Sequence, residues 1–206
     1  MEEAKTVLQK YIPENALDDV LKLLFSHKDL RIKITNPRKT KLGDYRRLNT
    51  FQHQISINNN LNKYQFLITL LHEIAHFLTY KNYGFKIKPH GPEWKATFGN
   101  ILKPFINQRI FPEELLPDLK KYAQNPKAST AGDGSLYLKL ARYDKPKDAK
   151  TKYIFELKTE DFFALPNGVI YQLLEKRRTR YKCKRLSNQK LYLIHKNAEV
   201  LPLIKE

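Results

Sequence analysis

Two histidines and a glutamate stand at a spacing that could support hydrolytic chemistry. They are His72, Glu73 and His76, in the run Leu-His-Glu-Ile-Ala-His. In a helix the two histidines lie on one face, about 6 Å apart along the axis, so both imidazoles can converge on one metal ion. The glutamate then lies beside the same face. Because a metal ion can polarise water while a carboxylate takes its proton, the pattern predicts a hydrolase, with another protein as substrate.

A third metal ligand is expected near the start of the next helix. Catalytic zinc takes three protein ligands and keeps one position open for water. His90 is the candidate, and Glu93 is an alternative oxygen ligand. We favour His90 because zinc prefers imidazole and because His90 precedes the helix-starting Pro92. Glu93 and Trp94 would then support the ligands, with Glu93 also able to cap the helix.

A purely structural role is the alternative for the histidine pair. His72 and His76 would then be core residues bonded to the backbone, and Glu73 would form an ion pair. A buried glutamate between two histidines is costly without a charge to meet. We therefore predict one zinc ion held by His72, His76 and His90, with Glu73 as the general base.

The elements that position these residues follow from hydrophobic periodicity. Residues 61–80 carry apolar side chains around most of a helix, so this helix should be largely buried. Residues 2–28 read as helical with a break, and residues 30–35 and 51–57 alternate as half-buried strands. The strand at 51–57 could pair with an extended substrate backbone. An ordinary interior strand is the alternative.

Composition divides the chain near residue 130. Residues 124–134 are poor in apolar side chains and read as a linker. Short strands are expected after it, at residues 136–143, 153–157, 169–174, 178–186 and 191–195. The expected fold class is α+β. A first domain at 1–123 would hold N-terminal helices, a small antiparallel or mixed sheet and the histidine helix, and a small basic β-rich domain would follow at 135–206.

Length, cysteine content and apolar runs limit the class of protein. The chain has 206 residues, of which 41% are hydrophobic, so a folded protein is expected. No apolar run approaches the roughly 18 residues needed to span a bilayer, and no secretory signal is evident. The single cysteine, Cys183, excludes an internal disulfide framework. We expect a cytoplasmic protein without a membrane partner.

The net charge of +17 points to a polyanionic partner. Nucleic acid is the commonest large polyanion in a cell, so DNA is the expected partner, which would place the protein at the nucleoid. The alternative is that the basic surface only keeps the protein soluble.

One basic segment concentrates this charge. Residues 176–185 hold seven positive side chains in ten positions. A twisted hairpin displaying them around a tyrosine could grip phosphate and stack on an unpaired base, as in single-stranded DNA or a disrupted duplex. A solvated strand whose charges discourage aggregation is the alternative. The candidate nucleic-acid contacts are Arg46, Arg47, Arg177, Arg178, Arg180, Tyr181, Lys182, Lys184 and Arg185.

The two histidine motifs together resemble the SprT-like metallopeptidases, which include the Spartan proteases that cut proteins crosslinked to DNA. The resemblance is carried by residues 71–76 and by His-Gly-Pro-Glu-Trp-Lys at 90–95. Residues 41–46 and 55–58 are similar to the family's glycine-containing hairpin and to its strand before the catalytic helix. The resemblance covers roughly residues 30–105. It implies a zincin-like fold, zinc on the three histidines, Glu73 as catalytic base, and DNA-stimulated cleavage of DNA-bound or DNA-crosslinked proteins.

The chain also departs from the family. Many members carry a C-terminal zinc ribbon built from paired cysteines, whereas this tail has only Cys183. We expect the tail to be a metal-free remnant of such a ribbon. Two other functions stay open: a nucleic-acid-binding module with a structural zinc, and a zinc peptidase with a regulatory target unrelated to DNA.

Overall fold

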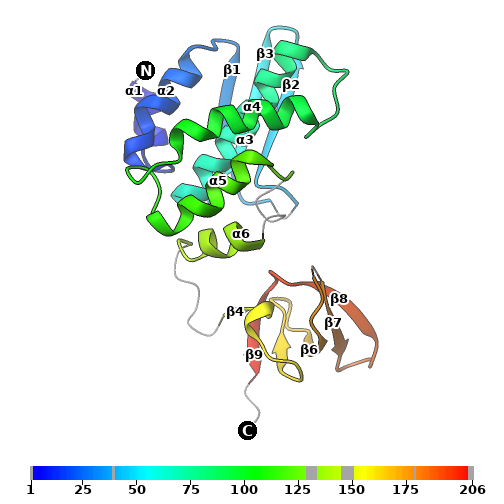
Figure 1. Cartoon of the computed structure of the whole chain (residues 1–206). Coiled ribbons are helices and arrows are strands. Elements are labelled where there is room, and N and C mark those ends of the chain that lie inside the picture. Colours follow the sequence, from blue (N-terminus) through cyan, green and yellow to red (C-terminus); the bar gives the residue numbers. More distant parts are fainter. Residues whose placement is uncertain (1, 39, 129–133, 145–150, 179, 204–206) are drawn as a thin grey trace. The chain divides into compact units, whose positions relative to one another are not determined.

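The chain forms two compact units, which are visible in Figure 1. The computed structural model describes residues 2–38, 40–128, 134–144, 151–178 and 180–203. We call residues 1–144 the N-terminal unit and residues 145–206 the C-terminal unit. The described residues form six α-helices and two β-sheets, which is compatible with the expected α+β class. None of the described helices is both long and apolar enough to cross a membrane.

The N-terminal unit combines helices with a small sheet. Its elements are α1 (Glu2–Leu8), α2 (Leu17–Phe25), β1 (Leu30–Thr35), β2 (Gly43–Asn49), β3 (Gln52–Asn58), α3 (Lys63–Tyr83), α4 (Pro92–Leu102), α5 (Leu116–Gln124) and α6 (Gly134–Ala141), with short 3-10 turns at Glu14–Ala16, Lys103–Phe105 and Glu113–Leu115. The strands predicted at 30–35 and 51–57 are therefore present, the second one shifted by a residue.

The sheet of this unit is mixed, with β3 in the centre. Strand β1 pairs with β3 in parallel, and β2 pairs with β3 antiparallel. Of the two roles left open for residues 51–57, the structure shows the ordinary interior strand and not substrate pairing, because both edges of β3 are already occupied by strands of the chain. Strand β2 instead lies at the edge of the sheet.

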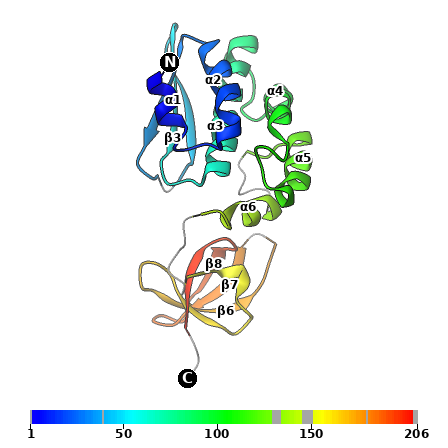
Figure 2. The ribbon, with the colours of Figure 1, turned by 90° about the vertical axis from the view of Figure 1, so that its left-hand side faces the viewer.

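Helix α3 is the central element of the N-terminal unit. It packs on β2 and β3 with one side and on α4 with the other, as Figure 2 shows. Most of its side chains are buried, as the sequence predicts. The side chain of Asn62 caps its first turn by accepting a hydrogen bond from the Gln65 N–H. The Asn62 amide also donates to the Leu140 carbonyl and to the Asp144 carboxylate.

Residues 136–143 were expected to be a strand, and this prediction is wrong. Residues Gly134–Ala141 form helix α6, with Leu136 and Leu140 fully buried in the core of the N-terminal unit. The run Leu-Tyr-Leu-Lys-Leu satisfies both the strand and the helix period. Helix α6 packs against α5 and against the turn at Glu113–Leu115. Lys139 of α6 also forms an ion pair with Asp118 of α5.

The division between the units falls later than the sequence suggested. The linker was expected at 124–134, whereas the N-terminal unit continues to Asp144 because α6 belongs to it. Residues 129–133 of that expected linker lie outside the described residues.

The C-terminal unit is a single curved sheet. Its strands are β4 (Lys152–Tyr153), β5 (Phe162–Ala164), β6 (Ile170–Glu175), β7 (Arg180–Arg185), β8 (Leu191–His195) and β9 (Glu199–Leu203), with a 3-10 turn at Ile154–Glu156. Strands β5 to β8 form an antiparallel meander, and β9 returns to pair with β5 and β4. Cys183 is buried among apolar side chains in the core of this unit.

The burial pattern of α6 predicts how three leucine substitutions will differ. Leu136→Ala and Leu140→Ala should each lower the free energy of unfolding by about 2–5 kcal/mol, because both side chains are fully buried. Leu138→Ala should cost clearly less, since Leu138 is only partly buried. Urea unfolding of the full chain measures the three values. Equal costs at all three positions would favour a strand and contradict the helix.

Candidate metal centre

Helix α3 carries His72 and Glu73 side by side in the middle of its length, and His76 follows one turn later. The two histidines are one helical turn apart, so their rings lie on the same side of the helix. Their Nε2 atoms are 3.2 Å apart. The spacing that the sequence offered is therefore realised as converging side chains.

His90 reaches the same point from the connection between α3 and α4. Its backbone has φ of 59°, a left-handed conformation that is uncommon outside glycine. Gly91 follows in extended conformation, and Pro92 begins α4. A Cβ atom at Gly91 would lie 2.8 Å from the Lys88 carbonyl oxygen, so the turn needs a glycine here. This tight turn directs His90 back toward α3.

The indole of Trp94 supports all three imidazoles. Its ring centroid lies 4.6 Å from that of His72, 5.1 Å from that of His76 and 4.6 Å from that of His90. Trp94 is itself almost fully buried, and it stacks on Phe98 one turn further along α4. The aromatic packing restricts the rotamers of the ligand side chains.

The three Nε2 atoms form a triangle suited to one cation. The His76 to His90 distance is 3.0 Å, and the distances from His72 to the other two are both 3.2 Å. Three imidazole nitrogens cannot all hydrogen-bond to one another, because each carries either one hydrogen or one lone pair in its ring plane. They can all direct lone pairs at one ion. Around tetrahedral zinc, neighbouring nitrogens are about 3.3 Å apart.

The electrostatics favour the protonation state that binds metal. Burial, together with the neighbouring imidazoles, lowers the pKa of His72 to about 2 and that of His76 to about 4. Burial also lowers the pKa of His90. All three rings are therefore neutral near pH 7, and only neutral imidazole is a metal ligand. Among the described residues, these three form the group able to hold a metal ion.

Glu73 is buried beside the triad, with 7% of its surface exposed. Burial raises its pKa to about 8, and the nearby Asp44 carboxylate acts in the same direction. A hydrogen bond from the Tyr45 backbone N–H to the Glu73 carboxylate favours the charged form and partly offsets this rise in pKa. A cation on the three imidazoles would lower the pKa further by direct attraction.

Strand β2 approaches α3 very closely at Glu73. A Cβ atom at Gly43 would lie 2.7 Å from Glu73 Oε1 and 2.7 Å from Thr69 Cγ2. Only glycine allows the backbone to come this near. The close approach brings the Tyr45 N–H within reach of the Glu73 carboxylate and fixes its position.

Two hollows of the surface border the centre. A cleft of about 490 Å³ is lined by the three histidines, Glu73 and Tyr45. A smaller pocket of about 170 Å³ continues past His72 and Glu73 and is lined by Leu42, Ile68, Thr69 and Tyr122. Gly43, His72 and Glu73 border both hollows.

Sequence reasoning missed the contribution of β2 to this site. The resemblance indicated a glycine-containing hairpin at residues 41–46, but it did not place Asp44 and Tyr45 beside Glu73. Glu93 lies in the first turn of α4 and is not part of the histidine group.

Arg46 and Arg47 of the β2–β3 hairpin contact neighbouring groups of the hairpin and of α3. Arg46 Nε lies 2.5 Å from Asp44 Oδ2. Arg47 donates to the Asn49 carbonyl and to the Thr50 hydroxyl, and its guanidinium lies over the Tyr80 ring.

The residues of the C-terminal unit that were expected to contact nucleic acid lie on both sides of β7. Tyr181 is 8% exposed and packs in the core, so its ring is not available to stack on a base, and this part of the expectation is corrected. Arg185 lies on the same inward side and hydrogen-bonds to Tyr192. Alternation along the strand decides these positions. On the outward side or in the preceding turn lie Arg177, Arg178, Arg180, Lys182 and Lys184.

Gly43→Ala should lower the free energy of unfolding by about 1–3 kcal/mol, because the new methyl group would overlap Glu73 and Thr69. Adding Thr69→Ser removes one of the two closest contacts and should restore part of the loss. Urea midpoints of the single and double variants test this. A Gly43→Ala chain as stable as the parent would contradict the close approach.

Comparison with known proteins gives one match. A protein-family model described as the SprT-like family matches residues 13–115, which is half of the 206-residue chain. The matched segment spans β1, β2, β3, the three histidines and Glu73. Neither a curated protein nor a solved structure matches the chain.

Proposed function

The chain belongs to the SprT-like family, and on this premise we propose that it is a zinc-dependent endopeptidase. The family supports a metalloprotease-type domain, and one observation carries the proposal further. Three neutral imidazoles converge on one point, and a buried carboxylate follows one ligand directly in the helix. This arrangement, on a helix packed against a small mixed sheet, is what a zincin-like fold would provide.

Zinc is the metal that fits the donors. Three imidazole nitrogens with space for a fourth ligand match catalytic zinc, whereas calcium and magnesium prefer oxygen. The cysteine of the chain is buried in the C-terminal unit and takes no part in the histidine group. We therefore propose a single zinc ion on His72, His76 and His90. When bound, it would polarise a peptide carbonyl and a water molecule.

Glu73 is the proposed general base. Its carboxylate would accept a proton from the attacking water and return that proton to the nitrogen of the departing amine. The Tyr45 N–H and the close backbone at Gly43 hold the carboxylate in one orientation. Trp94 keeps the imidazoles in place from the other side. Glu93, at the start of α4, could assist by favouring the helix start.

The substrate would be an extended protein segment. The edge strand β2 lines the large cleft through Gly43, Asp44 and Tyr45, and an edge strand can pair with an extended backbone. The 170 Å³ pocket beyond Glu73 has room for one side chain of the substrate. Its lining by Leu42 and Ile68 favours an apolar one.

Glu73→Gln should retain zinc and lose protein cleavage by a factor of about 10² to 10⁴, because the amide cannot accept the proton. His72→Ala should lose zinc as well as cleavage. Metal content after gel filtration and cleavage of a basic DNA-binding protein measure the two effects. Glu113→Gln, at an exposed position on another turn, is the matched control. Undiminished cleavage by Glu73→Gln would contradict the proposed role of Glu73 as the general base.

We further propose that DNA stimulates this activity and that the substrates are DNA-bound or DNA-crosslinked proteins. The charge of +17 supports a polyanionic partner. The tip of the β2–β3 hairpin supports contact with unpaired bases, because Phe51 is 81% exposed and Leu48 is 50% exposed beside Arg46 and Arg47. An exposed aromatic ring among cations is the usual platform for single-stranded nucleic acid.

Single-stranded DNA should raise the cleavage rate of the zinc-loaded protein, and Phe51→Ala with Arg46→Ala should reduce that stimulation several-fold, because stacking and phosphate contact are both lost. The ratio of rates with and without DNA is the readout. Lys22→Ala, an exposed lysine on α2, is the control. Raised salt should weaken the stimulation.

Two outcomes would favour the other functions. DNA binding without any cleavage by the zinc-loaded chain would indicate a nucleic-acid-binding module with a structural zinc. Cleavage at the same rate with and without DNA would indicate a zinc peptidase whose target is unrelated to DNA.

A further inference from the structure

We propose that the outward face of β7 and β8 is a docking surface for an acidic peptide strand that also carries aliphatic side chains. We call this surface the β7–β8 face. It is formed by Arg180, Lys182, Lys184, Leu191 and Leu193. It lies in the C-terminal unit and uses neither the histidines nor Glu73, so it goes beyond the proposed peptidase.

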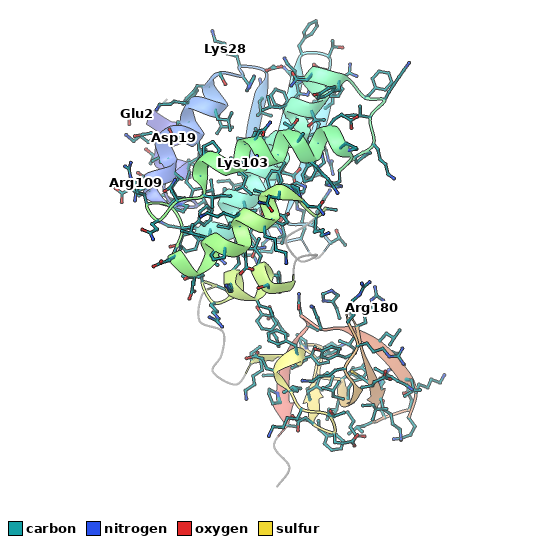
Figure 3. All side chains as sticks on the ribbon, viewed as in Figure 1. Glu2, Asp19, Lys28, Lys103, Arg109 and Arg180 are labelled. Atoms are coloured by element: carbon teal, nitrogen blue, oxygen red, sulfur yellow. The ribbon has the colours of Figure 1, made fainter. Side chains whose placement is uncertain are left out.

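The strand register places these five residues on one side of the sheet. Lys184 is opposite Leu191, and Lys182 is opposite Leu193. Tyr181 and Cys183, which alternate with them on β7, point into the core of the unit. Figure 3 shows the labelled Arg180 at the surface of this unit.

The charged side chains that β7 contributes to the face are all cationic. Strands β7 and β8 contain no acidic residue, as their sequences Arg-Tyr-Lys-Cys-Lys-Arg and Leu-Tyr-Leu-Ile-His show. On the neighbouring strand, Glu175 is opposite Lys182. Its two carboxylate oxygens accept hydrogen bonds from Arg177, so this acid is already engaged. The three cations of the face therefore favour an acidic partner.

The apolar side chains of the face are unusually open to water. Leu191 is 56% exposed and Leu193 is 54% exposed. Ile170 and Leu186, each 38% exposed, lie at one end of the same side of the sheet. Exposed leucines at alternate positions of an edge strand invite pairing with another chain, and proteins normally avoid this arrangement. Aliphatic side chains of a partner would cover these leucines.

The outer edge of β8 suits a peptide better than a nucleic acid. It is the last strand in the order β4-β9-β5-β6-β7-β8, so its outer edge has no partner among the described strands. Backbone N–H and C=O groups of an added strand can pair with such an edge. A nucleic acid would instead gain from aromatic rings on the surface. Here the rings of Tyr171 and Tyr181 are buried, so the observations favour a peptide.

The experiment measures binding of a short fluorescent peptide to the full chain by fluorescence anisotropy. The peptide alternates Glu and Leu at every second position, with Thr between them, so that both kinds of side chain lie on one face of the added strand. We expect salt-sensitive binding. Lys182→Gln with Lys184→Gln, and separately Leu191→Ser with Leu193→Ser, should each weaken it about tenfold or more. All four positions are at least partly exposed, and matching thermal unfolding curves will verify the fold.

Three controls decide the interpretation. Leu201→Ser changes a leucine that is 39% exposed on β9, which β5 and β6 separate from β7 in the sheet, and should leave binding unchanged. A peptide with Gln in place of Glu should bind poorly. An oligothymidine of similar charge should bind more weakly and should not respond to the leucine substitutions. Tight oligothymidine binding that depends on the same lysines and leucines would overturn the peptide assignment, as would peptide binding that none of the substitutions changes. Peptidase activity is not a readout, so the outcome is independent of the proposed function.

Discussion

Helix α3 carries polar side chains through the middle of a hydrophobic core, and much of the N-terminal unit is arranged to satisfy them. Thr69 and Thr79 donate their hydroxyls to carbonyls one turn back in the same helix. Glu73 cannot be satisfied within the helix, and it depends on the backbone of β2. A buried carboxylate without a partner would be costly, so the position of β2 and the burial of Glu73 are mutually dependent.

The site is closely packed on both sides. Gly43 lets the sheet touch α3 on the Glu73 side, while Trp94 fills the space behind the histidines on the α4 side. Each side depends on the size of one residue. Gly43 is the smallest residue and lets the backbone approach, whereas Trp94 has the largest side chain and packs against the imidazoles. Enzymes need such supports because a misplacement of about 1 Å in a reacting group can cost a large factor in rate.

The sequence allowed the local parts of this site to be predicted, and the parts set by pairing were missed. His72, Glu73 and His76 lie within five residues of one helix, so their geometry follows from helical periodicity alone. The role of Tyr45 depends on the register of β2 against β3, which no local pattern fixes. The inward position of Tyr181 likewise depends on which side of β7 is covered. Helix α6 was mistaken for a strand because Leu136 and Leu140 fit both periods, and only tertiary packing distinguishes them.

The cap at the start of α3 also determines where a shortened version of the protein can end. The Asn62 amide that caps the helix donates to Asp144, which is the last residue of the N-terminal unit. A shortened protein cut at the sequence-predicted boundary near residue 123 would lose α6 and this anchor together. The first turn of the histidine-bearing helix would then lose a partner about ten residues before His72. The smallest fragment that keeps this cap therefore extends past α6 and includes Asp144, although the family match ends at residue 115.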